Sequence, residues 1–345
     1  MRHTADVGII GGGPVGLFAI FECGMHKLSC AVIDTLPEVG GQCSTLYPEK
    51  PIYDIPAYPK ILAGELIRQL EAQARPFNPR FYLNQQVTHI IPREDGWHLK
   101  TSKDQELVVK CILIAGGVGA FGPKKPPLEN IEAYENKSIF YFIKNKEMFR
   151  DKRVVIAGGG DSAVDWALEL KDIATKVMFV HRRPKFRATP DTTEKLHQAA
   201  AKGQIELVVP YQLEALEGRN GMLTAVRVKT LDGQMTTLSA DFLLPFFGLS
   251  MNLGPIAEWG LTLDHNHIPV DPGTCGTSTP GVYAIGDIAI YPHKQKLILS
   301  GFAESAQAAH AMRRFLYPNE VVHFEYSTTK GAPGFSSYEE NCERT

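Results

Sequence analysis

The sequence lacks any pair of cysteines at the spacing of a redox dithiol or a zinc site. Its six cysteines are scattered over 345 residues, and no two of them stand as Cys-x-x-Cys. This spacing argues against a disulfide framework and against a zinc cluster, and it is typical of proteins from a reducing compartment. We therefore expect no metal site and a cytoplasmic location.

Long apolar runs and an excess of charge of one sign are also missing. The first apolar segment, Val7 to Ile10, runs into glycines and is too short for a secretory signal. No stretch approaches the roughly 18 apolar residues that a membrane span needs. The 36 basic and 38 acidic residues give a formal net charge of −2. We expect neither a membrane protein nor a nucleic-acid binder, and any anionic ligand must meet a local basic patch.

A glycine-rich turn near the N-terminus has the context of a dinucleotide site. In VGIIGGGPVGLFAIFECG, a β-branched strand leads into Gly11-x-Gly13-x-x-Gly16 and an apolar-periodic helix follows. Such glycines allow a tight turn, close approach of a pyrophosphate and close packing of helix on strand. Asp34 ends the next strand, 18 residues after Gly16, where a carboxylate can accept hydrogen bonds from ribose hydroxyls. We predict that FAD or NAD binds here, with Val15 part of the same turn; the alternative is a glycine turn without a ligand.

The pattern recurs in KRVVIAGGGDSAVDWALEL, with a different ending to its second strand. Gly158-x-Gly160-x-x-Ala163 follows a strand, and TKVMFV then leads to His181, which lies 21 residues after Gly160 and is followed by arginines. Guanidinium groups at that position can surround a ribose 2′-phosphate. The alternative is a solvated basic loop. We predict an NADPH site formed by Gly158, Gly160, Asp161, Ser162, His181, Arg182, Arg183 and Arg187.

Opposite charges after the two glycine turns indicate two different nucleotides, FAD at the first and NADPH at the second. The length suggests about two domains. The segments 110–127 and 241–255 each look like an apolar strand that ends at a Gly/Pro-rich crossover. We expect an α/β fold of two Rossmann-like, three-layer nucleotide-binding domains. The expected boundaries are residues 1–118 and 250–325 for the FAD domain, 119–249 for the NADPH domain and 326–345 for a C-terminal extension.

A third motif, Ala284-Ile285-Gly286-Asp287, resembles the second flavin signature of two-dinucleotide-domain flavoproteins, in which this aspartate bonds the ribityl and pyrophosphate region. A helix expected over residues 297–315 would point its N-terminus at the flavin and stabilise the reduced anion. The three motifs in this order resemble thioredoxin-reductase-like flavoproteins. Longer strings resemble the thioredoxin-reductase-type ferredoxin–NADP(+) reductases: GGGPVGLF, GGQCSTLYPEKPIYDIP, GGGDSAVDWALEL, HRRPKFRA and GDIAIYPHKQKLI.

The resemblance implies a set of flavin contacts and a homodimer. Tyr47 would stack on the isoalloxazine, and the C-terminal extension would cover the partner's flavin, with Tyr326 at its stacking position. Asp34 stands where many relatives have Glu, a change that should be tolerated. The contacts carried over by the resemblance are Asp34, Gln42, Tyr47, Val87, Phe121, Asp287, Thr328 and Thr329.

The place where thioredoxin reductases carry their active-site Cys-x-x-Cys reads SIFYFIKNKEMFRDKRVV here and holds no cysteine. A dithiol relay is therefore excluded, and electrons on the flavin must leave to an external acceptor. The resemblance implies hydride transfer between NADPH and FAD, then single-electron exchange with ferredoxin or flavodoxin, with no acid or base required. Cys43 lies near the flavin by position, and we interpret it as a buried structural thiol; a redox role is the alternative.

Two other functions stay open on the same nucleotide sites. One is an NADPH-dependent reductase of flavodoxin or of a small disulfide, which would need a thiol beside the flavin. The other is a flavin-binding regulatory protein without turnover. An acidic ferredoxin would need basic residues to dock on, each of which is alternatively an ordinary solvated side chain. The candidates are Lys124, Lys125, Lys144, Lys146, Arg150, Lys152, Arg153, Lys294 and Lys296.

Overall fold

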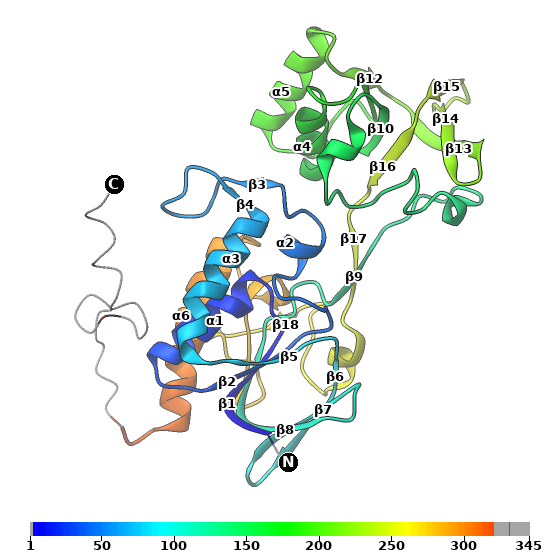
Figure 1. The fold of residues 1–345 in the computed structure, drawn as a ribbon. Helices are drawn as coiled ribbons and strands as arrows, with labels where there is room; N and C mark the ends of the chain where they lie inside the picture. The colour runs from blue at the N-terminus through cyan, green and yellow to red at the C-terminus, as the bar shows by residue number, and fades with distance from the viewer. Residues whose placement is uncertain (1–2, 321–330, 332–345) are drawn as a thin grey trace. The chain divides into compact units, whose positions relative to one another are not determined.

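The computed structural model describes residues 3–320 and residue 331. The chain forms two compact units: the first takes in the chain up to Ala120 and resumes at Met251, and the second is Phe121–Ser250 (Figure 1). The strands β9 (Ala120–Pro123) and β17 (Leu249–Asn252) carry the chain between the units and pair with each other. The second unit is thus an insertion into the first.

A seven-stranded sheet forms the centre of the first unit. Its order is β5-β2-β1-β8-β7-β6, and β19 also pairs with β8. β1 runs parallel to both β2 and β8, with Val7 opposite Cys30 on one side and Cys111 on the other. The strands are β1 (His3–Ile10), β2 (Cys30–Ile33), β5 (Arg80–Tyr82), β6 (Val87–Arg93), β7 (Gly96–Thr101), β8 (Glu106–Ile114) and β19 (Val282–Ala284).

Both faces of this sheet are covered, which explains the uninterrupted apolar sequence of β2. Cys30 and Val32 join a buried cluster with residues of the helices α1 (Pro14–Met25), α3 (Ala63–Ala74) and α6 (Ile298–Leu316). Ala31 and Ile33 point the other way, into a cluster with Val87 of β6. The parallel strands therefore lie between two covering layers, and the turns that follow them lie at the rim of the sheet.

The second unit has a four-stranded parallel sheet in the order β12-β11-β10-β16. Helix α4 (Asp161–Leu170) packs on this sheet, and α5 (Pro190–Ala201) packs on α4. On the other face, Val155 and Met178 share a buried cluster with Val226 and Val228. The latter belong to an antiparallel sheet of β13, β14 and β15. The bounds are β10 (Arg153–Gly158), β11 (Lys176–Val180), β12 (Glu206–Val208), β16 (Phe242–Phe246), β13 (Gln212–Arg219), β14 (Met222–Lys229) and β15 (Met235–Ser239).

The sheet of the first unit is mixed: β5, β2, β1 and β8 run parallel, and β7 and β6 continue it antiparallel. The sheet of the second unit is parallel. Each sheet lies between two covering layers, and the predicted α/β class is confirmed. Among the described residues, no helix is long and apolar enough to span a membrane, and no group of three or more metal-binding side chains is gathered. The shorter elements are α2 (Gln42–Thr45), β3 (Pro51–Ile52), β4 (Ile61–Leu62), β18 (Ile268–Pro269), β20 (Ala289–Ile290) and the 3-10 turns η1 (Arg75–Phe77), η2 (Ile131–Ala133), η3 (Lys146–Phe149), η4 (Gly254–Glu258) and η5 (Gly286–Ile288).

Candidate functional site

The loop between β1 and α1 brings backbone against backbone more closely than a side chain would allow. Gly11 has a φ of +110°, and a Cβ on it would lie 2.4 Å from the carbonyl oxygen of Ala115. A Cβ on Gly16 would lie 2.0 Å from the carbonyl oxygen of Gly11. A Cβ on Gly13, in contrast, would meet no atom within 4 Å. The first and third glycines are thus needed for packing, whereas Gly13 faces open space into which an anion can approach the backbone.

The start of α1 is suited to bind an anion. Gly13 is its N-cap and no side chain caps its first N–H groups, so these groups and the positive end of the helix dipole face the loop. A second glycine turn lies beside it, because the Gly40 N–H donates to the Gly12 carbonyl at 2.7 Å. The same turn leads into α2, whose first residue is Gln42, so this predicted flavin contact lies next to the glycine loop.

Asp34 directly follows β2, and backbone groups hold its carboxylate. Its Oδ2 accepts the Gly12 N–H at 2.6 Å, and its Oδ1 accepts the Leu36 N–H at 2.8 Å. Burial raises the pKa of this carboxyl group, and the backbone hydrogen bonds oppose that rise. A carboxylate oxygen can accept more than one hydrogen bond, so both oxygens can also accept from a ribose hydroxyl.

The predicted contact Val87 has its side chain in the core. Val87 is only 3% exposed and packs with Ala31 and Ile33. The chain just before it lies along Asp34, since the Gln85 N–H donates to the Asp34 carbonyl at 3.0 Å. Only the backbone of Val87 is therefore available to a ligand bound at Asp34.

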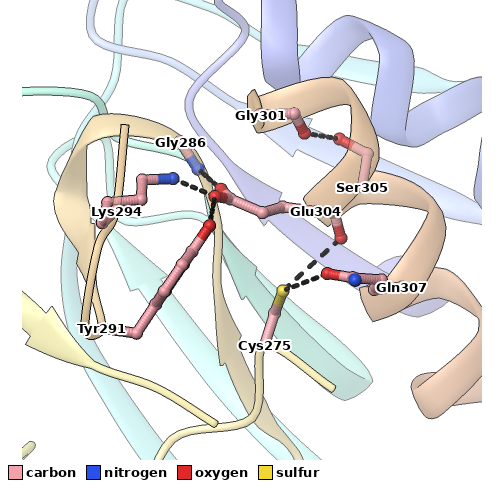
Figure 2. A network of polar contacts seen from close by, with 8 residues as sticks. All are labelled: Cys275, Gly286, Tyr291, Lys294, Gly301, Glu304, Ser305 and Gln307. Atoms are coloured by element: carbon pink, nitrogen blue, oxygen red, sulfur yellow. Dashed lines mark hydrogen bonds and ion pairs between the residues drawn. The ribbon is translucent and has the colours of Figure 1, made fainter. Parts of the chain in front are cut away.

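A buried carboxylate that the sequence analysis did not single out holds the third motif. Glu304 of α6 is 2% exposed and accepts hydrogen bonds from the Gly286 N–H at 2.7 Å and from the Tyr291 hydroxyl at 2.6 Å (Figure 2). The Lys294 ammonium group forms an ion pair with the same carboxylate. The sequence did indicate that this carboxylate is buried, because position 304 falls on the apolar stripe of the helix, where a charged residue needs a buried partner.

The prediction that Lys294 offers a docking charge to an acidic partner is wrong. Its side chain is 1% exposed, and its charge is compensated by Glu304. The surrounding polar string YPHKQK suggested an exposed segment, and the sequence could not show that one of its lysines turns inward. Lys296 is exposed, and its Nζ lies 2.6 Å from Nε2 of His267.

Asp287 lies in η5, directly after the glycine that Glu304 holds. Burial raises the pKa of its carboxyl group, and the positive charges of Lys296 and Lys294 oppose the rise. Tyr47 is close enough to this carboxylate to interact with its charge.

Helix α6 begins at Ile298, one residue after the predicted start, without a side-chain cap. The structure thus brings Tyr47, Asp287 and the glycine loop to one rim of the first unit.

Cys43 lies beneath this group, in α2. Its thiol is 1% exposed and in hydrogen-bond contact with the Tyr47 hydroxyl. Burial raises the pKa of the Cys43 thiol to about 11. A buried thiol with so high a pKa is a poor nucleophile at neutral pH.

The second glycine loop repeats the close approach of the first. A Cβ on Gly158 would lie 2.7 Å from the carbonyl oxygen of Phe246 and 2.8 Å from the Cβ of Ala163. A Cβ on Gly160 would meet no atom within 4 Å. Gly160 is the N-cap of α4, again without a side-chain cap, and Asp161 and Ser162, the first two residues of the helix, are exposed. Like the first loop, this loop offers an anion open space beside the backbone and uncapped N–H groups at a helix start.

Backbone hydrogen bonds fasten the basic segment to this loop. The Arg187 N–H donates to the Gly159 carbonyl at 2.6 Å, and the Thr189 N–H donates to Oδ1 of Asp161 at 2.8 Å. The segment also has an aromatic anchor, since Phe186 is 8% exposed and packs on the His181 ring with centroids 5.3 Å apart.

The arginines of this segment keep their charges available. Arg182, Arg183 and Arg187 are exposed, and within the part of the chain that the structure describes none of them forms an ion pair with a carboxylate. Burial lowers the pKa of His181, and the charges of Arg182 and Arg187 lower it further. At neutral pH His181 therefore adds little positive charge to that of the guanidinium groups.

Some predicted contacts cannot be placed. Tyr326, Thr328 and Thr329 lie outside the described residues, together with the rest of the expected C-terminal extension except residue 331. Phe121 belongs to β9, but its side chain lies outside what the structure describes.

Comparison with known proteins gives matches over nearly the whole chain. The model of the pyridine nucleotide-disulphide oxidoreductase family matches residues 5–313. A protein of Paramagnetospirillum magneticum named ferredoxin–NADP reductase is 54% identical over 333 residues, which cover 96% of this chain and 99% of that protein. A protein of the same name from Acidiphilium cryptum is 56% identical over 332 residues, covering 96% and 98%.

Solved structures match in fold. The thioredoxin reductase of Lactococcus lactis, in its FR conformation, has a TM-score of 0.78 at 25% identity and covers 91% of this chain and 99% of its own. The thioredoxin reductase of T. acidophilum has a TM-score of 0.79 at 22% identity, with coverages of 90% and 98%. The predicted thioredoxin-reductase-like fold is confirmed.

The burial of Cys43 predicts slow alkylation. With a pKa of about 11, about 0.1% of this thiol is ionised at pH 8, against about a quarter of an unperturbed thiol. We expect iodoacetamide to label Cys43 more than about 100-fold more slowly in the folded apoprotein than in urea, and about tenfold faster for each pH unit from 8 to 10. Mass spectrometry of the Cys43 peptide after timed labelling measures both rates. Equal rates in folded and unfolded protein would contradict the burial.

Proposed function

The chain belongs to the pyridine nucleotide-disulphide oxidoreductase family and, within it, to the ferredoxin–NADP reductases, and on this basis we propose that it passes electrons between NADPH and ferredoxin by way of FAD. When bound, the flavin exchanges a hydride with the nicotinamide and single electrons with an iron–sulfur partner. The observation that carries the proposal is the contrast between two similar glycine loops, one followed by a carboxylate and the other by guanidinium groups.

The first unit supplies the FAD site in this proposal. The open space at Gly13 and the uncapped start of α1 suit a pyrophosphate. The Asp34 carboxylate can accept hydrogen bonds from ribose hydroxyls and repels a 2′-phosphate. Tyr47 and Asp287 are held at the same rim, where the ring can stack on the flavin and the carboxylate can bond the ribityl region. The residues proposed to bind FAD are Gly11, Gly13, Val15, Gly16, Asp34, Gln42, Tyr47, Val87, Phe121 and Asp287, with Tyr326, Thr328 and Thr329 from the C-terminal extension.

The second unit supplies the NADPH site. Its loop offers the same open space at Gly160, and three exposed guanidinium groups stand where the 2′-phosphate belongs. Bonds between these groups and a phosphate are charge-assisted and bidentate, so they favour NADPH over NADH. The residues proposed to bind NADPH are Gly158, Gly160, Asp161, Ser162, His181, Arg182, Arg183 and Arg187.

Electrons leave directly to a protein acceptor in this proposal. The sequence holds no Cys-x-x-Cys relay, and the Cys43 thiol is buried. Ferredoxin is the partner we propose, with flavodoxin as a second one-electron carrier. The predicted docking residues of the second unit that are exposed are Lys124, Lys125, Lys144, Arg150 and Lys152. Four of the basic candidates of that unit lie in ion pairs: Lys125 with Glu135, Lys146 with Glu169, Arg150 with Glu147 and Arg153 with Asp241.

We also propose that the enzyme is a cytoplasmic homodimer. The five cysteines among the described residues are all free, as in proteins of a reducing compartment. The dimer is supported by the resemblance of the chain to its family, and measuring the mass of the protein in solution decides it.

Purified protein tests the activity directly. We expect it to bind FAD, to lose its flavin absorbance on anaerobic addition of NADPH, and to reduce cytochrome c at a rate that rises with added ferredoxin. The first two are read from the absorbance spectrum and the third from the reduced cytochrome band. A protein that stays colourless with FAD, or a rate of cytochrome c reduction that does not change when ferredoxin is added, would contradict the proposal.

The proposed binding of the 2′-phosphate by Arg182, Arg183 and Arg187, here called the 2′-phosphate clamp, is tested by removing two of these charges. We expect Arg182→Ala/Arg183→Ala to raise the KM for NADPH at least about tenfold and to change kcat/KM for NADH by less than about twofold, because only NADPH carries the phosphate. Steady-state kinetics with both nucleotides measure this. Arg219→Ala, which removes another exposed arginine of the same unit, is the control. Equal losses with NADPH and NADH would rule out the clamp.

A reductase of small disulfides would need a reactive thiol at the flavin, and Cys43 is the one that the sequence places there. Because its thiol is buried, we expect Cys43→Ser to keep more than about half of the ferredoxin-dependent rate. Cys111→Ser, a buried thiol of β8, is the matched control. NADPH oxidation driven by a disulfide in the wild type, and abolished by Cys43→Ser alone, would favour the disulfide reductase instead.

A further inference from the structure

The ion pair of Glu304 and Lys294 is not explained by stability. Both side chains are almost completely buried, so each charge has lost its hydration. Replacing such a pair by apolar side chains of similar size commonly leaves a protein as stable or more stable. A buried pair of this kind points to a need for a fixed geometry at this place in the fold.

Glu304 ties down both ends of the segment that carries Asp287. At one end its Oε2 accepts the N–H of Gly286, the residue before Asp287. Gly286 has a φ of +73°, so this hydrogen bond fixes a left-handed turn that glycine favours. At the other end its Oε1 accepts the hydroxyl of Tyr291 and pairs with Lys294 (Figure 2). A single carboxylate therefore closes the loop from residue 286 to residue 294.

The helix that carries Glu304 is itself fixed against the first glycine loop. The Ser305 hydroxyl lies within 3.3 Å of the Val15 carbonyl oxygen and 2.8 Å of the Gly301 carbonyl oxygen, both of which can accept its proton. A Cβ on Gly301 would lie 2.3 Å from Cγ2 of Val15, so only glycine lets the two helices approach so closely. The position of Glu304 is thereby defined relative to the start of α1, where the pyrophosphate is proposed to bind.

We propose that Glu304 is a positioning residue that sets the Gly286–Asp287 turn against the first glycine loop and thereby raises the affinity for FAD. The inference deepens the proposed function and rests on it, because it takes FAD as the ligand. Glu304 acts through the Gly286 N–H, and Lys294 compensates its charge in the core.

Two double variants separate the hydrogen bond from the charge. Glu304→Met/Lys294→Met removes both charges without leaving one unpaired, and it deprives the Gly286 N–H of its acceptor. Glu304→Gln/Lys294→Met also removes both charges, but its amide oxygen can still accept that N–H. We expect the Kd of the apoprotein for FAD, measured by quenching of flavin fluorescence, to rise at least about tenfold in the first variant. In the second it should return to within about threefold of the wild type.

Asp6, which is more exposed than Glu304, provides a control with the same kinds of donor. Its carboxylate also accepts from a lysine, Lys110 at 2.8 Å, and from a backbone N–H and a hydroxyl, both of Ser29, at 2.9 and 2.7 Å. It lies within β1, five residues before Gly11. Asp6→Asn/Lys110→Met should change the melting temperature without changing the Kd for FAD.

The outcomes are distinct. Unchanged FAD affinity in Glu304→Met/Lys294→Met overturns the inference, whatever happens to its melting temperature. Equal losses of affinity in both Glu304 variants also overturn it, because the acceptor would then be irrelevant. A wild-type apoprotein that does not bind FAD overturns the proposed function, and this inference with it.

Discussion

Two carbonyl oxygens, those of Ala115 and Phe246, leave no room for a side chain on the glycine opposite, Gly11 in one unit and Gly158 in the other. Each oxygen lies at or just past the end of the parallel strand beside the glycine loop. Because the turn is pressed against that strand, the following helix starts directly at the rim of the sheet, with its first N–H groups uncapped. Both nucleotide sites depend on this approach, since it is what aims free N–H groups at the place where a pyrophosphate can lie.

The two units differ in the residues that follow the next strand. In both units backbone N–H groups hold this part of the chain in place. Asp34 is held by the backbone N–H groups of Gly12 and Leu36. The basic segment is held by the backbone N–H groups of Arg187 and Thr189, so its guanidinium groups stay exposed. Anchoring through the backbone lets a change of side chains at one strand end switch the preferred nucleotide while the fold stays the same.

Local spacing was enough to predict the glycine loops, the strand ends and the start of α6, because each is encoded within about twenty consecutive residues. It was not enough for the side chains whose environment is set by distant parts of the chain. Lys294 was predicted to be exposed because its neighbours are polar, yet it is buried against α6. Glu304 was missed because its partners, Gly286 and Lys294, belong to a different segment of the chain and meet it only in the folded protein. For Val87 the resemblance names a contact, but only the structure shows that its side chain belongs to the core.

The choice of glutamate at position 304 follows from counting donors. Gly286, Tyr291 and Lys294 all donate to the same side chain. An ionised carboxylate accepts on both oxygens and carries no donor hydrogen of its own. A glutamine there would direct its amide hydrogens at the Lys294 ammonium group or at the Gly286 N–H, and one donor would lose its acceptor. The cost of burying two charges is thus offset by a turn that has a single arrangement. In a proposed reaction that asks no acid, base or thiol of the protein, holding such groups in place is the main contribution that the chain can make.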